Sequence, residues 1–365
     1  SSPEDLDDVS DADFKLQLRI SKRKLDMAFQ MVVDDWLDDY KQDREEGLRE
    51  LFNFVVQCCG CKLMTREMFT SMQNADIISH LTKEFNELQD SVSYPVVAGG
   101  SLGRRFREGL CEFVSQLVRR CQNSLLYDEF LFSSLVAFLT GLADSQVRAF
   151  RHTSTLLMRL MSAVVKVAAV VYAQVQVTHR RFQLEKTKSS HQQATERLEE
   201  LQNSYNELLE HQEELDSLMN AIFKGVFVHR YRDKVPEIRA LCVAEMREWL
   251  RENPGAFLND GYLKYLGWML HDKQPGVRVQ AVLSLQKLYE EQDFIGRLEL
   301  FTSRFKERLL NMVLDRDSDV AEETVRLLLL IRNMDDGLSE EECSRVYPLV
   351  FSAHRGLASV TGEFL

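Results

Sequence analysis

Hydrophobic residues recur every three or four positions along most of this 365-residue chain, which is the spacing of one face of an α-helix. Between 25 and 56, Val32, Trp36, Leu37 and Tyr40 alternate with paired aspartates. We read the aspartates as the solvated face of a packed helix, since a metal site would need oxygen ligands converging in a loop. The same spacing predicts further helices at 65–69, 77–88, 105–123 and 127–139, with the main loop at 90–103.

A short motif recurs in the chain: an aspartate in a turn, then a valine, then in most copies an arginine near the start of an apolar helix. The aspartates of its four copies are Asp144, Asp233, Asp272 and Asp317. The valines of the last three copies, Val235, Val277 and Val320, are 42 and 43 residues apart, which is the length of a HEAT repeat. We expect each aspartate to cap the helix that follows it.

Residues 154–222 contain neither proline nor glycine, and their second half follows a heptad pattern. The members of that pattern are Leu198, Leu201, Tyr205, Leu208, Leu215, Met219 and Ile222. A polar turn at 187–193 precedes it. The combination predicts a long antiparallel helical hairpin that projects from the repeats and spans roughly 50 Å.

The chain has only 16 glycines and 6 prolines, too few for an all-β protein with a turn every 8–12 residues. We therefore predict an all-α fold, a HEAT-repeat α-solenoid with a long projecting antiparallel hairpin. The expected domains are an acidic disordered lead-in at 1–24, an N-terminal helical and HEAT region at 25–153, the hairpin at 154–225 and HEAT repeats at 226–365.

The N-terminus is acidic where a signal peptide would be basic and then apolar. No apolar run reaches 18 residues, and the best one, at 160–173, is interrupted by Lys166. The seven cysteines show no disulfide framework spacing. We expect a soluble protein with reduced thiols and no membrane partner.

The net charge of −12 hides a strong segregation of charge along the chain. Residues 101–190 hold 13 Lys and Arg against six Asp and Glu, whereas residues 1–50 and 191–220 are acidic. If a solenoid gathers the basic residues on one face, they form a track for the phosphate backbone of DNA, independent of base sequence. The alternative is that they are scattered solvating charges. The candidate DNA contacts are Arg104, Arg105, Arg107, Arg119, Arg120, Arg148, Arg151 and Arg159.

The sequence contains no pattern that indicates catalysis. Cys58, Cys59 and Cys61 cluster, but no second Cys or His pair follows at zinc spacing. The glycine-rich loop at 99–104 lacks the Gly-Lys-Ser/Thr ending of a phosphate-binding loop. We expect no catalytic residue, metal or cofactor, and therefore no enzyme.

One group of residues suits peptide binding. Its first helix contains Asp260, Tyr262, Lys264, Tyr265 and Trp268, of which the first, third and fifth share a helix face at i, i+4 and i+8. The next repeat supplies Leu300, Phe301, Arg304 and Phe305. Aromatic rings beside cations on adjacent helices suit a groove for a short peptide with aromatic anchors. The alternative is that these aromatics are core residues between stacked repeats.

Several stretches resemble the stromalin family, the HEAT-repeat SA subunits of cohesin. The main ones are LTGLADSQVRAFRHTST at 139–155, NAIFKGVFVHRYRD at 220–233, YLKYLGWMLHD at 262–272 and RLELFTSRF at 297–305. Residues 72–87 and 352–365 are similar too, so that the resemblance covers about 30–365.

This resemblance implies a non-enzymatic nuclear protein on chromatin that binds the kleisin subunit, the SMC heterodimer through kleisin, and duplex DNA. Such a subunit helps to load cohesin and to maintain sister-chromatid cohesion. It also implies a pocket, shared with kleisin, that docks regulators carrying two aromatics one residue apart. Carried over to this sequence, the pocket residues are Tyr231, Asp260, Lys264, Trp268, Leu300, Arg304 and Phe305. The alternative function is a HEAT-repeat adaptor for protein cargo that does not bind DNA.

The sequence also departs from the family. Family members are far longer, so we expect a fragment or a short paralogue. Residues 88–107 and 170–217 diverge, and the helix at 154–170 is one residue shorter than the family pattern, which would rotate the face that follows by about 100°. The divergence suggests a specialised form, such as a meiotic one.

Overall fold

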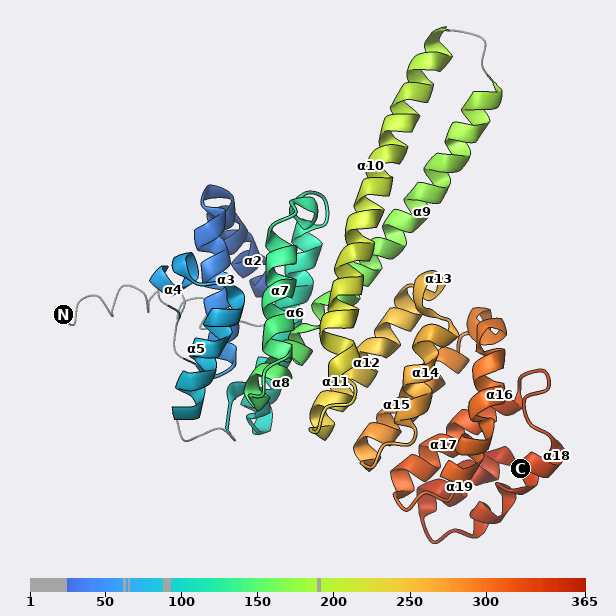
Figure 1. Ribbon diagram of the computed structural model, residues 1–365. Coiled ribbons are helices and arrows are strands. Elements are labelled where there is room, and N and C mark those ends of the chain that lie inside the picture. The colour runs from blue at the N-terminus through green and yellow to red at the C-terminus, as the bar shows by residue number, and fades with distance from the viewer. Residues whose placement is uncertain (1–24, 62–63, 65, 88–92, 189–191) are drawn as a thin grey trace. The chain divides into compact units, whose positions relative to one another are not determined.

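The computed structural model describes residues 25–61, 64, 66–87, 93–188 and 192–365 (Figure 1). All the regular secondary structure assigned within these ranges is helical, which confirms the all-α prediction. The chain divides into two compact units, an N-terminal unit that ends at Arg230 and a C-terminal unit at Tyr231–Leu365. The predicted lead-in at 1–24 lies outside the described residues, and the predicted four-part division of the chain stays a prediction.

The helices of the N-terminal unit are α2 (Leu25–Gln42), α3 (Arg44–Cys58), α4 (Arg66–Ser71), α5 (Asn74–Glu87), α6 (Gly100–Cys121), α7 (Leu131–Ala143), α8 (Arg148–Leu157), α9 (Leu160–Thr187), α10 (Gln192–Ile222) and α11 (Val228–Arg230). A short π-helix at Phe223–Phe227 joins the last two. The helices predicted at 105–123 and 127–139 are α6 and α7, with shifted ends.

The helical pattern over 25–56 corresponds to two helices, α2 and α3, because the chain breaks at Asp43. This residue has an extended backbone (φ −145°), and its side chain accepts a hydrogen bond from the Glu46 N–H, so that a new helix begins. The side chain of Gly47 is only a hydrogen, which lets α3 close on α2; a Cβ there would lie 2.8 Å from the Tyr40 Cα. The Trp36 Nε1–H donates to the Gly47 carbonyl and fixes this corner.

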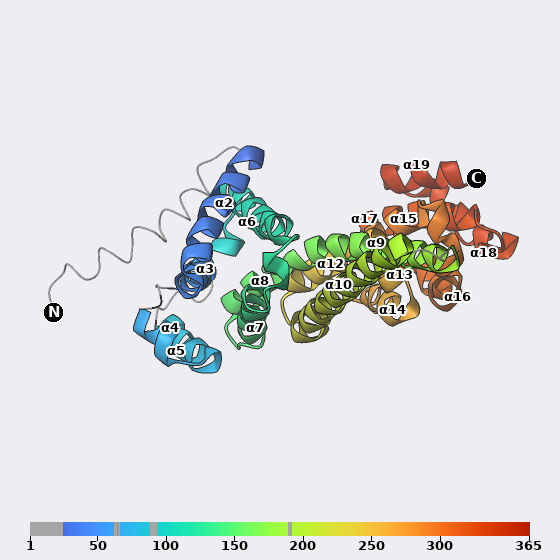
Figure 2. The same cartoon turned by 90° about the horizontal axis from the view of Figure 1, so that it is seen from above.

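Helices α9 and α10 form the predicted hairpin. They run side by side in both views, and α10 packs on α7 at its C-terminal end (Figure 1, Figure 2). Of the predicted heptad residues, Leu215, Met219 and Ile222 are buried, whereas those nearer the tip are partly exposed. Residue 154, the first of the predicted hairpin segment, lies in α8, and α9 begins at Leu160. Part of the predicted turn, 189–191, lies outside the described residues.

One stretch among the described residues, Arg148–Thr187 across α8 and α9, is long and apolar enough to cross a membrane by length and composition. The expectation that no segment reaches that length is therefore wrong. Its most apolar window is 67% buried inside the protein, as in a core helix. Helix α6 packs on both α8 and α9, which accounts for part of this burial.

The C-terminal unit consists of helix pairs. Its helices are α12 (Pro236–Glu252), α13 (Pro254–Phe257), α14 (Asp260–Met269), α15 (Pro275–Tyr289), α16 (Ile295–Met312), α17 (Ser318–Arg332), α18 (Glu340–Ser344) and α19 (Arg355–Phe364). Helices α12, α15 and α17 pack in succession, while α14 packs on α16 (Figure 1). This is the arrangement of a HEAT solenoid, as predicted.

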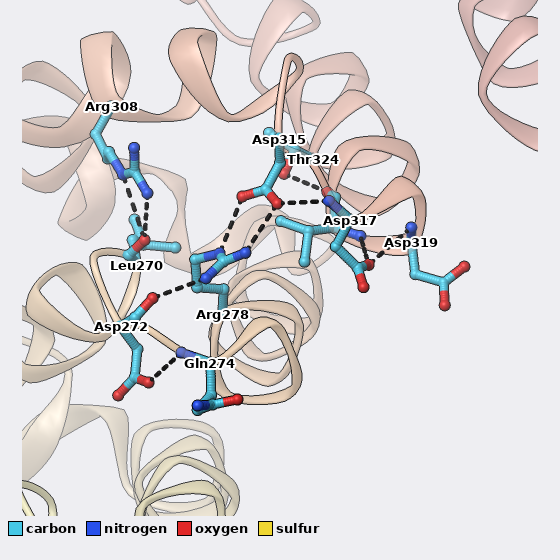
Figure 3. A network of polar contacts seen from close by, with 10 residues as sticks. Leu270, Asp272, Gln274, Arg278, Arg308, Asp315, Asp317, Asp319 and Thr324 are labelled. Carbon is cyan, nitrogen blue, oxygen red and sulfur yellow. Dashed lines mark hydrogen bonds and ion pairs between the residues drawn. The ribbon is translucent and has the colours of Figure 1, made fainter. Parts of the chain in front are cut away.

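An arginine–aspartate ladder links successive repeats. Arg239 donates from Nε and Nη2 to both carboxylate oxygens of Asp272, at 2.7 and 2.9 Å. Arg278 binds Asp315 in the same way, with both distances 2.9 Å (Figure 3). Each arginine also donates to the backbone carbonyl of the residue six positions before it. Each guanidinium therefore binds both the loop that precedes its own helix and the corresponding loop of the next repeat.

The prediction that the motif aspartates cap the following helices is correct only for Asp317, whose side chain accepts hydrogen bonds from the N–H groups of Asp319 and Val320 (Figure 3). The helix N-caps in the other copies are Val147, Val235 and Gln274. Asp233 and Asp272 instead accept a hydrogen bond from the N–H two residues on. The residue equivalent to them in the fourth copy is Asp315, not Asp317.

Candidate functional site

The candidate peptide site lies where α14 and α16 approach each other. Asn259 starts α14 by accepting a hydrogen bond from the Gly261 N–H. Two turns later Gly267 meets the ring of Phe305 on α16; a Cβ at Gly267 would lie 2.2 Å from the Phe305 Cζ. The absent side chain lets the two helices come close enough for their surface residues to form one patch.

Three aromatic rings form the centre of this patch. Tyr231 meets Tyr265 edge to face, with 4.9 Å between ring centroids, and Tyr265 meets Trp268 in the same manner at 5.2 Å. Tyr231 and Trp268 are 6.3 Å apart. Burial, with a smaller contribution from Tyr231, raises the pKa of Tyr265. Since 44% of the Trp268 side chain is exposed, its indole is available to a ligand.

Two cations flank the rings. The Lys264 Nζ lies 5.4 Å from the ring centroids of both Tyr265 and Trp268, as the i, i+4 spacing predicted. On α16, the guanidinium carbon of Arg304 lies 5.6 Å from the ring centroid of Phe305. Such distances are within the range of cation–π attraction, so the cations hold the rings and present positive charge beside them.

The structure places all seven predicted pocket residues in the C-terminal unit. Tyr231, Lys264 and Trp268 are linked by ring contacts, and Phe305 is buried against Gly267. Asp260 and Leu300 lie one turn N-terminal to Lys264 and Arg304, on α14 and α16. Leu300 is 54% exposed. Both readings of the sequence therefore apply in part: Phe305 is a core aromatic, whereas Trp268 and Leu300 face solvent.

The predicted set omits two residues on which the patch depends. Tyr265 is the ring that bridges Tyr231 and Trp268, and Gly267 permits the close approach of Phe305. The spacing of Tyr265 three residues before Trp268 was a signal for the first. The sequence carries no equivalent signal for Gly267, because its partner is 38 residues away.

The eight arginines predicted to contact DNA fall into three groups. Arg107 and Arg151 hold loops: Arg107 donates to the carbonyls of Val96 and Ala98, and Arg151 donates to that of Gln146 at 2.8 Å. The exposed group consists of Arg104, Arg105, Arg119 and Arg120 on α6 and Arg148 at the start of α8. Arg159, between α8 and α9, is partly buried.

Several exposed arginines already have acidic neighbours. Arg119 lies 3.7 Å from Glu112, and Arg120 lies 3.4 Å from Asp34 on α2. The acidic face of α2 therefore offsets part of the basic charge of α6. Exposed pairs of this kind typically contribute about 1 kcal/mol or less to stability.

The clustered thiols are core residues. Cys58, Cys59 and Cys61 are buried, and burial raises the pKa of Cys61 to about 12. A metal ligand needs the thiolate, which this environment disfavours. Elsewhere Asp319, Glu322 and His354 come together, but His354 caps α19 and Glu322 forms an ion pair with Arg326, so both are already engaged.

The fold and the patch define a class: a HEAT-repeat protein with an exposed aromatic and cationic surface. Within it, the model of the stromalin conservative domain matches residues 232–306, which contain six of the seven predicted pocket residues, and the model of the STAG domain matches residues 92–204. The chain belongs to the stromalin family, the cohesin SA subunits.

Individual relatives agree with this assignment. Cohesin subunit SA-3 of Homo sapiens is 53% identical over 349 residues, covering 95% of this chain and 28% of the relative. Cohesin subunit scc-3 of Caenorhabditis elegans is 36% identical, covering 91% and 30%. The solved cohesin subunit Scc3 from Z. rouxii has the same fold, with a TM-score of 0.81 and 21% identity over 100% of this chain and 43% of that one. The chain thus spans less than a third of these two curated relatives.

Proposed function

We propose that this protein is a non-enzymatic SA subunit of cohesin. It acts on chromosomes in the nucleus, binds the kleisin subunit and, through kleisin, the SMC heterodimer, and supports cohesin loading and sister-chromatid cohesion. Its relatives named as cohesin subunits support this role, since 95% of the chain aligns with one of them at 53% identity. Co-purification of the tagged chain with SMC and kleisin subunits from nuclease-treated nuclear extract tests it.

The observation that carries the finer proposal is the exposed Trp268 between Lys264 and Tyr265, within the segment that matches the stromalin conservative domain. We propose that this patch, with kleisin, docks regulators that carry two aromatic residues one position apart. An exposed indole backed by buried rings offers a large apolar contact at little entropic cost. Asp260 and Arg304 supply charges of opposite sign for the polar part of the peptide.

The test is Trp268→Ala in the chain bound to kleisin. We expect the peptide acetyl-Phe-Gly-Phe-amide to bind at least tenfold more weakly to the variant, because truncating a central aromatic typically costs about 2 kcal/mol. Isothermal titration calorimetry measures the affinity, and circular dichroism checks the fold. Phe351→Ala is the matched control, since Phe351 is 89% exposed and lies outside the patch. Equal affinity in the wild type and Trp268→Ala would reject the site.

We further propose that the exposed arginines of α6 and α8 contact the DNA backbone. The net positive charge of residues 101–190 and the exposure of five of the eight candidates support this proposal. The competing function, an adaptor for protein cargo, predicts no DNA binding at about 50 mM salt, a concentration at which even weak phosphate contacts are measurable.

A further inference from the structure

A cleft of about 440 Å³ lies in the N-terminal unit, at the base of the hairpin. It is formed by the turn before α7, by α7 itself and by the last turns of α10. Much of its wall is apolar, from Leu126, Phe130, Val136 and Leu218. A hydrocarbon group that enters it leaves water at a gain of about 25 cal/mol per Å² of buried surface.

Three carboxylates line the same cleft: Asp128, Glu129 and Glu214. None of the described residues lining it is basic. Arg44 stacks over the ring of Phe130 at 4.2 Å but is not among the lining residues. We call this feature the acidic cleft.

One of the three carboxylates is already satisfied by the protein. The Asp128 Oδ1 accepts hydrogen bonds from the N–H groups of Phe130 and Leu131, each at 2.9 Å. Its Oδ2 accepts one from the Tyr40 hydroxyl at 2.7 Å. Asp128 therefore fixes the turn before α7 and with it the position of the next residue, Glu129.

The other two carboxylates, those of Glu129 and Glu214, repel each other. Burial raises the pKa of Glu214, and the nearby Glu129, which shares a hydrogen bond with it, raises it further. Glu213 and Asp128 contribute repulsion of the same sign. Glu129 is exposed and Glu214 is half-buried. Two like charges so close to each other are unfavourable, and a cation placed between them would relieve that repulsion.

The cleft thus combines an apolar wall with unbalanced negative charge, and both features have to be matched by its ligand. We propose that the acidic cleft binds a segment of a partner protein in which a Lys or Arg side chain lies beside an apolar residue. The apolar residue and the alkyl stem of the cation contact Phe130, Val136 and Leu218, while the charged head reaches Glu129 and Glu214. This site is separate from the Trp268 patch and does not rest on the function proposed for it.

The test uses the full chain with ¹³C-labelled Leu and Val methyl groups. Its probes are two dipeptides, acetyl-Leu-Lys-amide and acetyl-Leu-Glu-amide, which differ in the sign of one charge. We expect the lysine dipeptide to shift the NMR signals of the Val136 and Leu218 methyl groups in a saturable manner, and the glutamate dipeptide to leave them unchanged. Glu129→Gln and Glu214→Gln should each weaken the lysine dipeptide about tenfold, the effect of losing one charge-assisted contact.

Glu210→Gln is the matched control, because Glu210 is an exposed acid on the same helix α10 and does not line the cleft. It should bind the lysine dipeptide as the wild type does. Equal shifts from both dipeptides, no shift at all, or unchanged affinity in both cleft variants would overturn the proposal. So would shifts of the two methyl groups on dilution of the chain alone, which would identify a second copy as the occupant.

Discussion

At the scale of single residues, two neighbouring positions on α14 determine the candidate site. At Gly267, the ring of Phe305 occupies the space that a side chain would need. Trp268, its neighbour, projects nearly half of its surface into solvent. Two neighbouring residues therefore have different roles: Gly267 permits the close contact between α14 and α16, and Trp268 exposes a ring to solvent.

We expect Gly267→Ala to destabilise the protein by about 1–3 kcal/mol, since the new methyl group overlaps the buried ring of Phe305. Thermal unfolding followed by circular dichroism measures the effect. Gly276→Ala is the control: it adds the same methyl group at the start of α15, where no heavy atom lies within 4 Å. An equal loss of stability in both variants would show that the contact with Phe305 is not the cause.

The cysteines provide a second test at this scale. Burial raises the pKa of Cys61 and of Cys121 to about 12, whereas Cys111 is partly exposed. At pH 8 a thiol of that pKa is about one part in 10⁴ thiolate, so iodoacetamide should modify Cys111 far faster than either of them. Raising the pH by one unit should speed labelling of Cys61 and Cys121 about tenfold. Mass spectrometry of the folded chain measures these rates, and rapid labelling of Cys121 at pH 8 would contradict the structure.

At the scale of elements, the arginine–aspartate ladder sets how helix pairs stack. Both side chains of the Arg278–Asp315 pair are nearly buried, with 13% and 8% exposed. A buried carboxylate that loses the guanidinium hydrogen-bonded to it is costly. The ladder is thus a point where one substitution disturbs two repeats at once.

We expect Arg278→Ala to destabilise the chain by about 3–5 kcal/mol, measured by urea unfolding. Adding Asp315→Ala should recover part of this loss, because it removes the stranded charge. Arg345→Ala is the control, since the Arg345–Glu307 pair is exposed and pairs of that kind contribute about 1 kcal/mol or less. Strict additivity of the two ladder substitutions would mean that the residues act independently.

The elements also show what the sequence predicts and what it does not. The heptad residues of α10 and the spacing of the repeats are local patterns, so the hairpin and the solenoid were predictable. The break at Asp43 was not, because apolar residues recur at helical spacing on both sides of it and the capping aspartate looks like any other surface acid. The ladder was misread as capping because its contacts join residues 33 and 37 positions apart. Tyr265 was named among the aromatics of the candidate site but not included in the pocket, since only the folded chain brings Tyr231 beside it.

At the scale of the whole molecule, charge is segregated more strongly than the net value suggests. The exposed arginines of α6 and α8 lie in a basic segment between two acidic ones. Charge-reversed variants separate a specific basic surface from the general effect of adding negative charge.

We expect Arg105→Glu and Arg148→Glu each to weaken binding of a duplex DNA about equally for any base sequence, and to lower the salt slope of the logarithm of affinity by about one. Fluorescence anisotropy at several salt concentrations measures both quantities. Arg316→Glu is the matched control, an exposed arginine outside the basic segment. If all three variants lose affinity equally, the effect belongs to net charge and not to a surface on α6 and α8.

The ladder has an end, and its position has a mechanical consequence. The residue six positions after Asp315 is Ala321, so α17 has no guanidinium at the point where α12 and α15 supply Arg239 and Arg278. An arginine that binds two loops resists shear between neighbouring repeats. This interaction is absent between α17 and the helices that follow it. Under an applied force, the C-terminal unit should therefore bend or fray first beyond α17, leaving α12 to α17 to move as one stiff rod.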